Sequence, residues 1–201
     1  MRRSQREEVL ELVYKHGCLT AHEAAQRGIH SQILTHLVRE GALERVARGQ
    51  YCLPNQPLTE HHSLAIVARA TPSGVVCLLS ALAFHGIGTQ LPAEVWVAID
   101  RRARRPNLRY PPLRVVRFSG QAFTAGIETH SVEGQSVRVY SIAKTLADLF
   151  KYRNKVGLDV ALEALREAWR ERKFTMDELD RYAGICRVQR VMTPYLEVLV
   201  Y

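Results

Sequence analysis

The sequence predicts an α+β protein, and three features of the 201-residue chain lead to that prediction. Residues 4–40 carry apolar side chains at helical spacing, divided by capping signals. Five short apolar runs between residues 75 and 140 are separated by turn residues, which is typical of a small, mostly antiparallel sheet. From Ser141 onward the pattern is helical, so the helices are segregated toward the C-terminal end.

The N-terminal region is predicted to begin with two short helices. The first covers residues 4–16, where apolar residues fall on one stripe, and Gly17 is expected to end it. The second begins after Thr20, because Thr20 and Glu23 match the spacing of a capping box. Gly28 is placed to close the second helix in a left-handed turn.

A third helix is predicted over residues 31–40, followed by a hairpin of strands at 42–46 and 50–53. One face of this helix is apolar and the other is polar. The polar face consists of Ser31, Gln32, Thr35, His36 and Arg39. Helix, helix, short turn, helix and hairpin is the element order of a winged helix-turn-helix, which we predict for residues 1–54.

This architecture suggests a domain that binds duplex DNA. The polar face of the third helix is expected to enter the major groove, where short polar and Arg side chains reach base edges. The hairpin is expected to lie near the phosphate backbone or minor groove, with Arg45, Arg48 and Gln50 in contact. The alternative is a protein-interaction module of the same shape whose polar face is merely solvated.

Residues 55–201 are predicted to form a second, α+β domain after a short linker at 55–57. Its helices are expected at 59–70, 80–85, 142–152, 156–171, 176–183 and 187–200, and its strands at 75–78, 95–99, 113–118, 127–132 and 136–140. Thr175 and Glu178 match a second capping box. Pro194 has no N–H to donate and is expected to interrupt or restart the last helix.

Positive charge is spread along the chain, whose net charge is +8. Basic residues outnumber acidic ones by eight to six in residues 1–54, nine to five in 55–140 and eleven to nine in 141–201. A DNA-binding N-terminal domain alone would not explain this distribution. A basic protein is suited to a polyanionic partner.

A dense run of arginine follows the strand at 95–99. It consists of Arg101, Arg102, Arg104 and Arg105. Because the planar guanidinium group suits phosphate, we interpret this loop as an anion contact. Its partner would be DNA phosphate, or an acidic partner such as RNA or a nucleotide-bound protein. The alternative is a solvated surface loop.

Cysteine usage and hydropathy indicate a cytoplasmic protein with no membrane span. Cys18, Cys52, Cys77 and Cys186 are far apart and form no C-x-x-C pair, which argues against a zinc site. The first residues lack the apolar stretch of a signal peptide, and no apolar run reaches membrane-spanning length. We therefore expect reduced thiols.

An enzyme is not expected. Glu94, Asp100, Glu128 and Lys144 are the residue types of a metal-dependent nuclease, but such a site requires them to converge from adjacent strands. Lys144 and Asp148 are four residues apart on one predicted helix, as in a surface or anchoring ion pair. No Gly-rich phosphate loop or recognisable nucleophile is present. We therefore expect no cofactor and no metal.

Three stretches, together with the N-terminal winged helix, resemble a known family. They are Arg48–Pro54 (RGQYCLP), Val76–Gly86 (VCLLSALAFHG) and Val139–Phe150 (VYSIAKTLADLF). In order and spacing they resemble the AbiEi family of antitoxins, the repressor half of the AbiE type IV toxin–antitoxin systems. The resemblance covers essentially the whole chain.

This resemblance implies a bifunctional regulator. The winged helix would bind inverted repeats in the promoter of its own operon and repress it, with two copies meeting on the DNA. The second domain would counteract a nucleotidyltransferase-like toxin without a stable complex. The basic DNA-binding surface would extend to Arg101–Arg105. Two alternatives remain, a stand-alone winged-helix regulator and a nuclease-like effector with a DNA-binding head.

Overall fold

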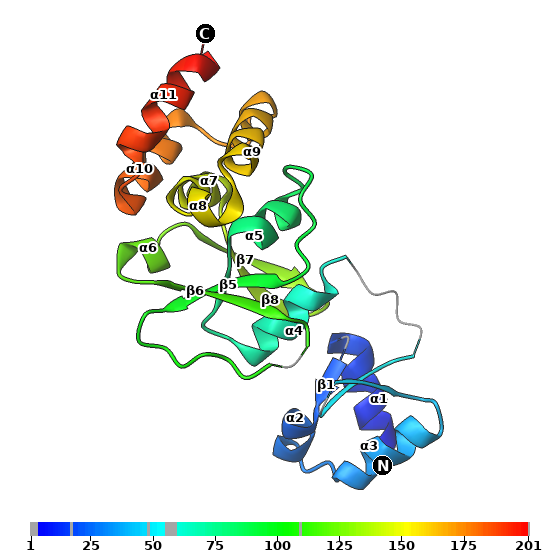
Figure 1. Ribbon diagram of the computed structural model, residues 1–201. Coiled ribbons are helices and arrows are strands. Elements are labelled where there is room, and N and C mark those ends of the chain that lie inside the picture. Colours follow the sequence, from blue (N-terminus) through cyan, green and yellow to red (C-terminus); the bar gives the residue numbers. More distant parts are fainter. Residues whose placement is uncertain (1–3, 17, 48, 55–59, 109, 201) are drawn as a thin grey trace. The chain divides into compact units, whose positions relative to one another are not determined.

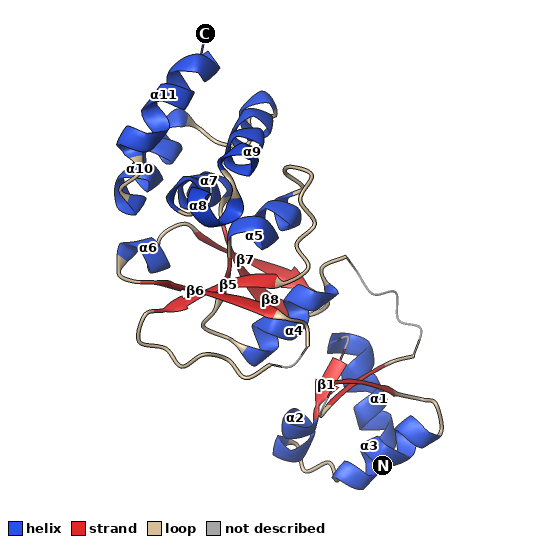
Figure 2. Ribbon diagram, viewed as in Figure 1, coloured by secondary structure: helices blue, strands red, loops and turns tan. Residues whose placement is uncertain are grey.

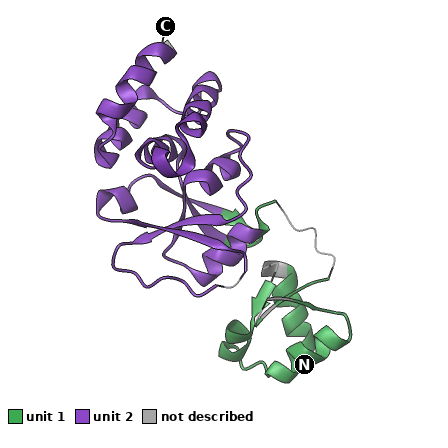
Figure 3. Ribbon diagram, viewed as in Figure 1, with its two compact units in different colours: residues 1–62, 131–135 green, residues 63–130, 136–201 purple. Residues whose placement is uncertain are grey.

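The fold is of the mixed α+β class, with a small antiparallel sheet and a larger mixed sheet. The computed structural model describes residues 4–16, 18–47, 49–54, 60–108 and 110–200 (Figure 1). The chain divides into two compact units, residues 1–62 with 131–135 and residues 63–130 with 136–201 (Figure 3). Each unit contains a hydrophobic core of its own.

The first unit contains the three predicted helices and both predicted hairpin strands. Its elements are α1 (Gln5–His16), β1 (Cys18–Thr20), α2 (Ala21–Gln26), α3 (Ser31–Arg39), β2 (Glu44–Ala47) and β3 (Gln50–Cys52). Strand β1 was not predicted, because three residues are too few to show alternation. It joins the hairpin as a third antiparallel strand, in the order β1-β3-β2.

The predicted helix signals are confirmed in this unit. Thr20 Oγ1 accepts the backbone N–H of Glu23, and the Glu23 carboxylate accepts the backbone N–H of Thr20, at 3.1 and 2.8 Å. Gly28, at φ +74°, provides the left-handed turn after α2. The apolar stripes of α1 and α3 meet in a core that includes Val9, Val13, Ile29, Leu34, Leu37 and Leu43.

A disulfide joins Cys18 and Cys52, which corrects the expectation that all four thiols are reduced. The two residues are direct partners in the β1·β3 register, with Cα atoms 4.3 Å apart. Their separation of 34 residues gave no hint of a pair, because the strand that brings them together was not predicted. Cys77 and Cys186 are free and buried.

The remaining elements follow the predicted order. They are α4 (His62–Ala70), β4 (Val75–Val76), α5 (Leu78–His85), β5 (Val95–Asp100), β6 (Leu113–Phe118), α6 (Gln121–Thr124), β7 (Ile127–Val132), β8 (Gln135–Tyr140), α7 (Ile142–Lys151), α8 (Arg153–Val156), α9 (Leu158–Arg170), α10 (Met176–Cys186) and α11 (Gln189–Val200). The short helices α6 and α8 were not predicted. The expected positions of Gly17 and of the linker at 55–57 lie outside the described residues. Helix α4 was expected to start at about residue 59, but residues 60 and 61 form a turn and the helix begins at His62.

The larger sheet is mixed, so the prediction of a mostly antiparallel sheet was wrong. Its strand order is β6-β5-β4-β8-β7, in which β4 pairs antiparallel with β5 while the β4·β8 and β5·β6 pairs are parallel. The prediction assumed that consecutive strands form hairpins. Instead, the connection at 101–112 returns the chain to the same end of the sheet, so β6 starts beside the start of β5.

Helix α7 is the centre of the helical layer and contacts α5, α9 and α10. Figure 2 shows this group of helices on one side of the sheet. Tyr140, Leu146 and Phe150 are fully buried in the core beneath them. Helix α11 is continuous through Pro194, which corrects the expected interruption, since one missing donor costs a single intrahelical hydrogen bond. No helix among the described residues combines the length and apolar character needed to cross a bilayer.

An ion pair between Lys144 and Asp148 lies inside the helical layer, with side chains 0% and 1% exposed and 2.5 Å between Nζ and Oδ2. Cys186 Sγ donates to Asp148 Oδ1 at 3.1 Å, and Lys144 Nζ lies over the rings of Tyr140 and Phe118 at 4.2 and 4.9 Å. Burial raises the pKa of Asp148, while the Lys144 ammonium opposes that rise. Of the two interpretations of this pair, the structure supports the anchoring one.

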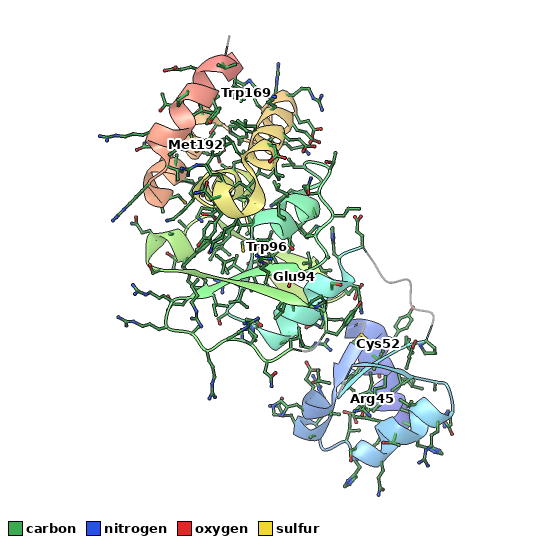
Figure 4. The ribbon with its side chains drawn as sticks, in the orientation of Figure 1. Arg45, Cys52, Glu94, Trp96, Trp169 and Met192 are labelled. Atoms are coloured by element: carbon green, nitrogen blue, oxygen red, sulfur yellow. A yellow bond between two sulfur atoms is a disulfide. The ribbon has the colours of Figure 1, made fainter. Side chains whose placement is uncertain are left out.

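Removing one member of the buried pair is expected to destabilise the second unit strongly. Asp148→Ala leaves an uncompensated ammonium in the core and should lower the free energy of unfolding by about 3–5 kcal/mol. The double variant Lys144→Met/Asp148→Leu removes both charges and should be near neutral. Urea unfolding followed by the fluorescence of Trp96 and Trp169 measures both (Figure 4). Equal losses in the single and double variants would contradict this assignment.

Removing the disulfide is expected to destabilise the first unit. The Cys18–Cys52 bond closes a ring that contains α2, α3 and β2, so Cys18→Ser/Cys52→Ser should lower its unfolding free energy by about 3–4 kcal/mol. Hydrogen exchange of the β1 and β3 amides measures this change. Tryptophan fluorescence serves as the control, because both tryptophans lie in the second unit. A reductant should produce the same change in the parent protein and none in the double variant.

Candidate nucleic-acid interface

The exposed face of α3 carries all five polar residues predicted to contact DNA. They are Ser31, Gln32, Thr35, His36 and Arg39. On the opposite face Leu34 and Leu37 are buried. Because these apolar side chains fix the rotation of the helix about its own axis, the polar residues share one exposed surface that base edges or phosphates can reach.

An ion-pair network extends this surface to α1. Glu40 binds Arg6 Nη1 at 2.9 Å through one carboxylate oxygen and His36 Nε2 at 3.0 Å through the other. A surface pocket of about 320 Å³ lies there, lined by residues of both helices: Gln5, Arg6, Gln32, Ile33, His36 and Leu37. Arg6 was not predicted as a site residue, because only the packing of α1 on α3 places it beside the polar face.

The hairpin is described only in part. Arg45 is exposed on β2 (Figure 4), and Gln50 lies on β3, where only its backbone is described. Arg48 lies outside the described residues. The carbonyl of Gly49 accepts the backbone N–H of Ala21 at 2.7 Å. This bond ties the turn of the hairpin to the first residue of α2, so the hairpin is held against the helical part of the unit.

In the second unit the loop after β5 exposes the predicted run of arginines. Arg101, Arg102, Arg104 and Arg105 are all exposed. Within the described ranges, none of these four guanidinium groups forms an ion pair with a carboxylate. Their charge is therefore available to an external anion.

The arginine loop has a defined backbone, which separates it from an ordinary solvated loop. Arg117 on β6 donates from Nη1 to the carbonyls of Arg101 and Ala103, at 2.9 and 2.8 Å. The N–H of Arg102 donates to Asp100 Oδ1 at 2.8 Å, and the N–H of Arg101 donates to the Phe118 carbonyl at 2.8 Å. Arg117 therefore acts as a clamp that holds the loop against the end of β6.

The four residue types of a metal-dependent nuclease are not brought together. Glu94 pairs with Arg114, Glu128 contacts His130, and Lys144 is buried in the core. In the part of the chain that the structure describes, no group of three or more His, Cys, Asp or Glu side chains is placed to hold a metal ion. Instead, Glu94 and Glu128 contact neighbouring basic side chains, and Asp100 accepts a hydrogen bond in the turn after β5.

A comparison with protein families finds a match in the N-terminal part of the chain. Residues 7–54 match the sequence model of a family described as transcriptional regulator, AbiEi antitoxin. The predicted resemblance to the AbiEi family is thus confirmed over these residues. Among curated proteins, no match is found.

A solved structure shares the fold. The chain is similar to the crystal structure of the RV2827C protein from Mycobacterium tuberculosis, with a TM-score of 0.58 and 14% identity. The alignment covers 91% of this chain and 72% of that protein. At this identity the similarity shows the fold alone, and it extends well beyond the family match at residues 7–54.

Loss of the clamp is expected to loosen the arginine loop. Arg117→Gln removes both hydrogen bonds to the carbonyls of Arg101 and Ala103, so trypsin should cleave within residues 101–105 faster than in the parent protein. Limited proteolysis with mass mapping of the fragments measures this rate. Arg114→Gln is the matched control, because Arg114 is exposed on the same strand but pairs with Glu94. Equal cleavage in both variants would argue against the clamp.

Proposed function

We propose that the chain is a sequence-specific, DNA-binding transcriptional repressor that acts as the antitoxin of a toxin–antitoxin system. The observation that carries this proposal is the exposed polar face of α3, within residues that match the AbiEi antitoxin regulator family. Residues 1–54 are proposed as a winged helix-turn-helix domain and residues 55–201 as the antitoxin-type domain.

In this proposal α3 is the recognition helix. Its exposed residues reach base edges in the major groove, and Arg39 can bind guanine with two hydrogen bonds. The β2–β3 hairpin is the wing, and Arg45 contacts phosphate or the minor groove. We also propose that Arg48 and Gln50 contact phosphate or the minor groove. Arg6, held by Glu40 beside His36, adds a cation at the edge of this surface.

The arginine loop is proposed as a second, sequence-independent contact. Arg101, Arg102, Arg104 and Arg105 have no acidic partner among the described side chains, and guanidinium groups pair well with phosphate. Phosphate contacts position a protein on DNA and make its affinity dependent on salt, but they do not read sequence.

The proposed regulatory circuit rests on the resemblance to the AbiEi family, whose sequence model matches residues 7–54. We propose that the protein represses its own operon through inverted repeats occupied by two copies. We also propose that it counteracts a nucleotidyltransferase-like toxin without a stable complex and has no catalytic activity of its own. The proposed location is the cytoplasm, where a disulfide such as Cys18–Cys52 is unusual. A stand-alone regulator remains the second candidate, and a neighbouring toxin gene would discriminate between the two.

Two arginine substitutions are expected to weaken DNA binding in different ways. Arg39→Ala removes a base contact and should cost about 1–3 kcal/mol on the operator, with a smaller loss on scrambled duplex. Arg104→Ala removes a phosphate contact, so it should weaken binding to both duplexes equally and reduce the salt slope by about 1. Fluorescence anisotropy with the chain's own upstream DNA at several salt concentrations measures both effects.

Arg166→Ala provides the control for this experiment. Arg166 is an exposed arginine on α9, and in the sequence it is far from both proposed DNA-contacting surfaces. Arg166→Ala changes the net charge by the same amount as Arg39→Ala or Arg104→Ala, and it should leave the affinity for DNA nearly unchanged. If Arg39→Ala and Arg104→Ala also leave affinity and salt slope unchanged, the proposed interface is wrong.

A further inference from the structure

A cavity of about 590 Å³ opens where the parallel strands β5 and β6 end. It is lined by Asp100, Arg101, Arg102, Ser119 and Gly120. These residues follow or close the two strands, so the cavity lies at their carboxyl ends. In doubly wound α/β sheets, ligands bind in a crevice at the carboxyl ends of parallel strands, and β5 and β6 are a parallel pair.

The walls of the cavity are held in place by hydrogen bonds. The N–H of Arg101 donates to the carbonyl of Phe118, which joins the two strand ends at 2.8 Å. The clamp from Arg117 holds the carbonyls of Arg101 and Ala103. On the other wall Gly120 adopts φ +55°, a conformation that L side chains rarely adopt. The site is therefore largely formed before any ligand arrives.

The chemistry of the lining is mixed rather than uniformly basic. Arg101 and Arg102 provide two guanidinium groups, and among the described residues neither has a carboxylate partner. Ser119 adds a hydroxyl group. Asp100 adds a carboxylate, whose Oδ1 already accepts the N–H of Arg102. A ligand that carries both an anion and hydrogen-bond donors is complementary to this set, because its donors can pair with the carboxylate while its anion pairs with the arginines.

The size of the cavity selects among phosphate-bearing ligands. Small-molecule sites typically enclose about 300–1,000 Å³, and this volume exceeds what a lone phosphate ion fills. Arg104 and Arg105 are exposed outside the cavity, where a duplex backbone can reach them. A mononucleotide matches on both counts, because its phosphate suits the two arginines and its sugar hydroxyls suit Asp100.

We propose that this cavity binds a free mononucleotide, with Arg101 and Arg102 on the phosphate and Asp100 on a sugar hydroxyl. This inference goes beyond the proposed repressor function and does not depend on it. Because Arg101 and Arg102 are also assigned to the proposed DNA surface, bound nucleotide and DNA phosphate would compete for them. The proposed occupant is the free nucleotide, and nucleic acid at the same arginines is an outcome of the test.

Isothermal titration of the full chain tests the proposal with three probes: adenosine 5′-monophosphate, adenosine and inorganic phosphate. The monophosphate should bind at least tenfold more tightly than either of the other two. Arg101→Ala and Arg102→Ala should each weaken its binding at least tenfold. Asp100→Asn retains an oxygen that can accept the Arg102 N–H, and it should reduce the preference for the monophosphate over inorganic phosphate.

Arg105→Ala is the matched control, because Arg105 belongs to the same loop but does not line the cavity. It should change the affinity for the monophosphate by less than twofold. Tryptophan fluorescence of each variant verifies the fold, since Trp96 lies on β5, the strand that leads into the loop. If Arg101→Ala and Arg102→Ala both misfold, the monophosphate should instead protect the 101–105 loop of the parent protein from trypsin.

Four outcomes would overturn the proposal. They are no binding of any probe, equal binding of inorganic phosphate, equal loss of affinity in Arg105→Ala, and binding of a labelled duplex that Arg101→Ala and Arg102→Ala weaken while the monophosphate does not bind. The last outcome would assign the arginines to nucleic acid alone. Arg39→Ala separates this test from that of the proposed function, because it should impair operator binding and leave nucleotide binding unchanged.

Discussion

The second unit depends on an ion pair that has no access to water. Lys144 and Asp148 face each other within α7, the helix that contacts α5, α9 and α10. A charge in such a place is tolerated only while its partner is present, so the pair restricts how α7 can sit in the core. Lys144 also lies over the ring of Tyr140 at the end of β8, and Asp148 accepts from Cys186 at the end of α10. One turn of α7 thereby links the end of β8 to the end of α10.

The two units present cationic groups in different ways. In the first unit the rotation of α3 is fixed by apolar packing, and its polar side chains share one surface. In the second unit the arginines stand on a loop whose backbone is held by Arg117 and by the strand ends. The first arrangement suits discrimination between base sequences, while the second suits recognition of phosphate. The proposed function therefore assigns sequence recognition to the polar face of α3 and phosphate contact to the arginine loop.

Local signals in the sequence predicted most elements, whereas pairings between distant segments could not be predicted. The capping boxes at Thr20 and Thr175 appear as expected, since each depends on residues three positions apart. The Cys18–Cys52 disulfide and the parallel pairing of β5 with β6 were missed because both depend on which strands become neighbours. The polar face of α3 was predicted from periodicity alone. The cavity beside Arg101 was not, because it is built from two strand ends that lie 18 residues apart in the chain at Asp100 and Phe118.

The Arg117 clamp makes the shape of the arginine loop depend on one edge of the sheet. Arg117 can hold the loop only while β6 is paired with β5. Strand β6 lies at the edge of the sheet, where local opening requires the least free energy. Each such opening releases the loop while leaving its charge intact. The stability of one sheet edge therefore sets the fraction of molecules whose arginines are preorganised, and the apparent affinity for any phosphate ligand falls in proportion to that fraction.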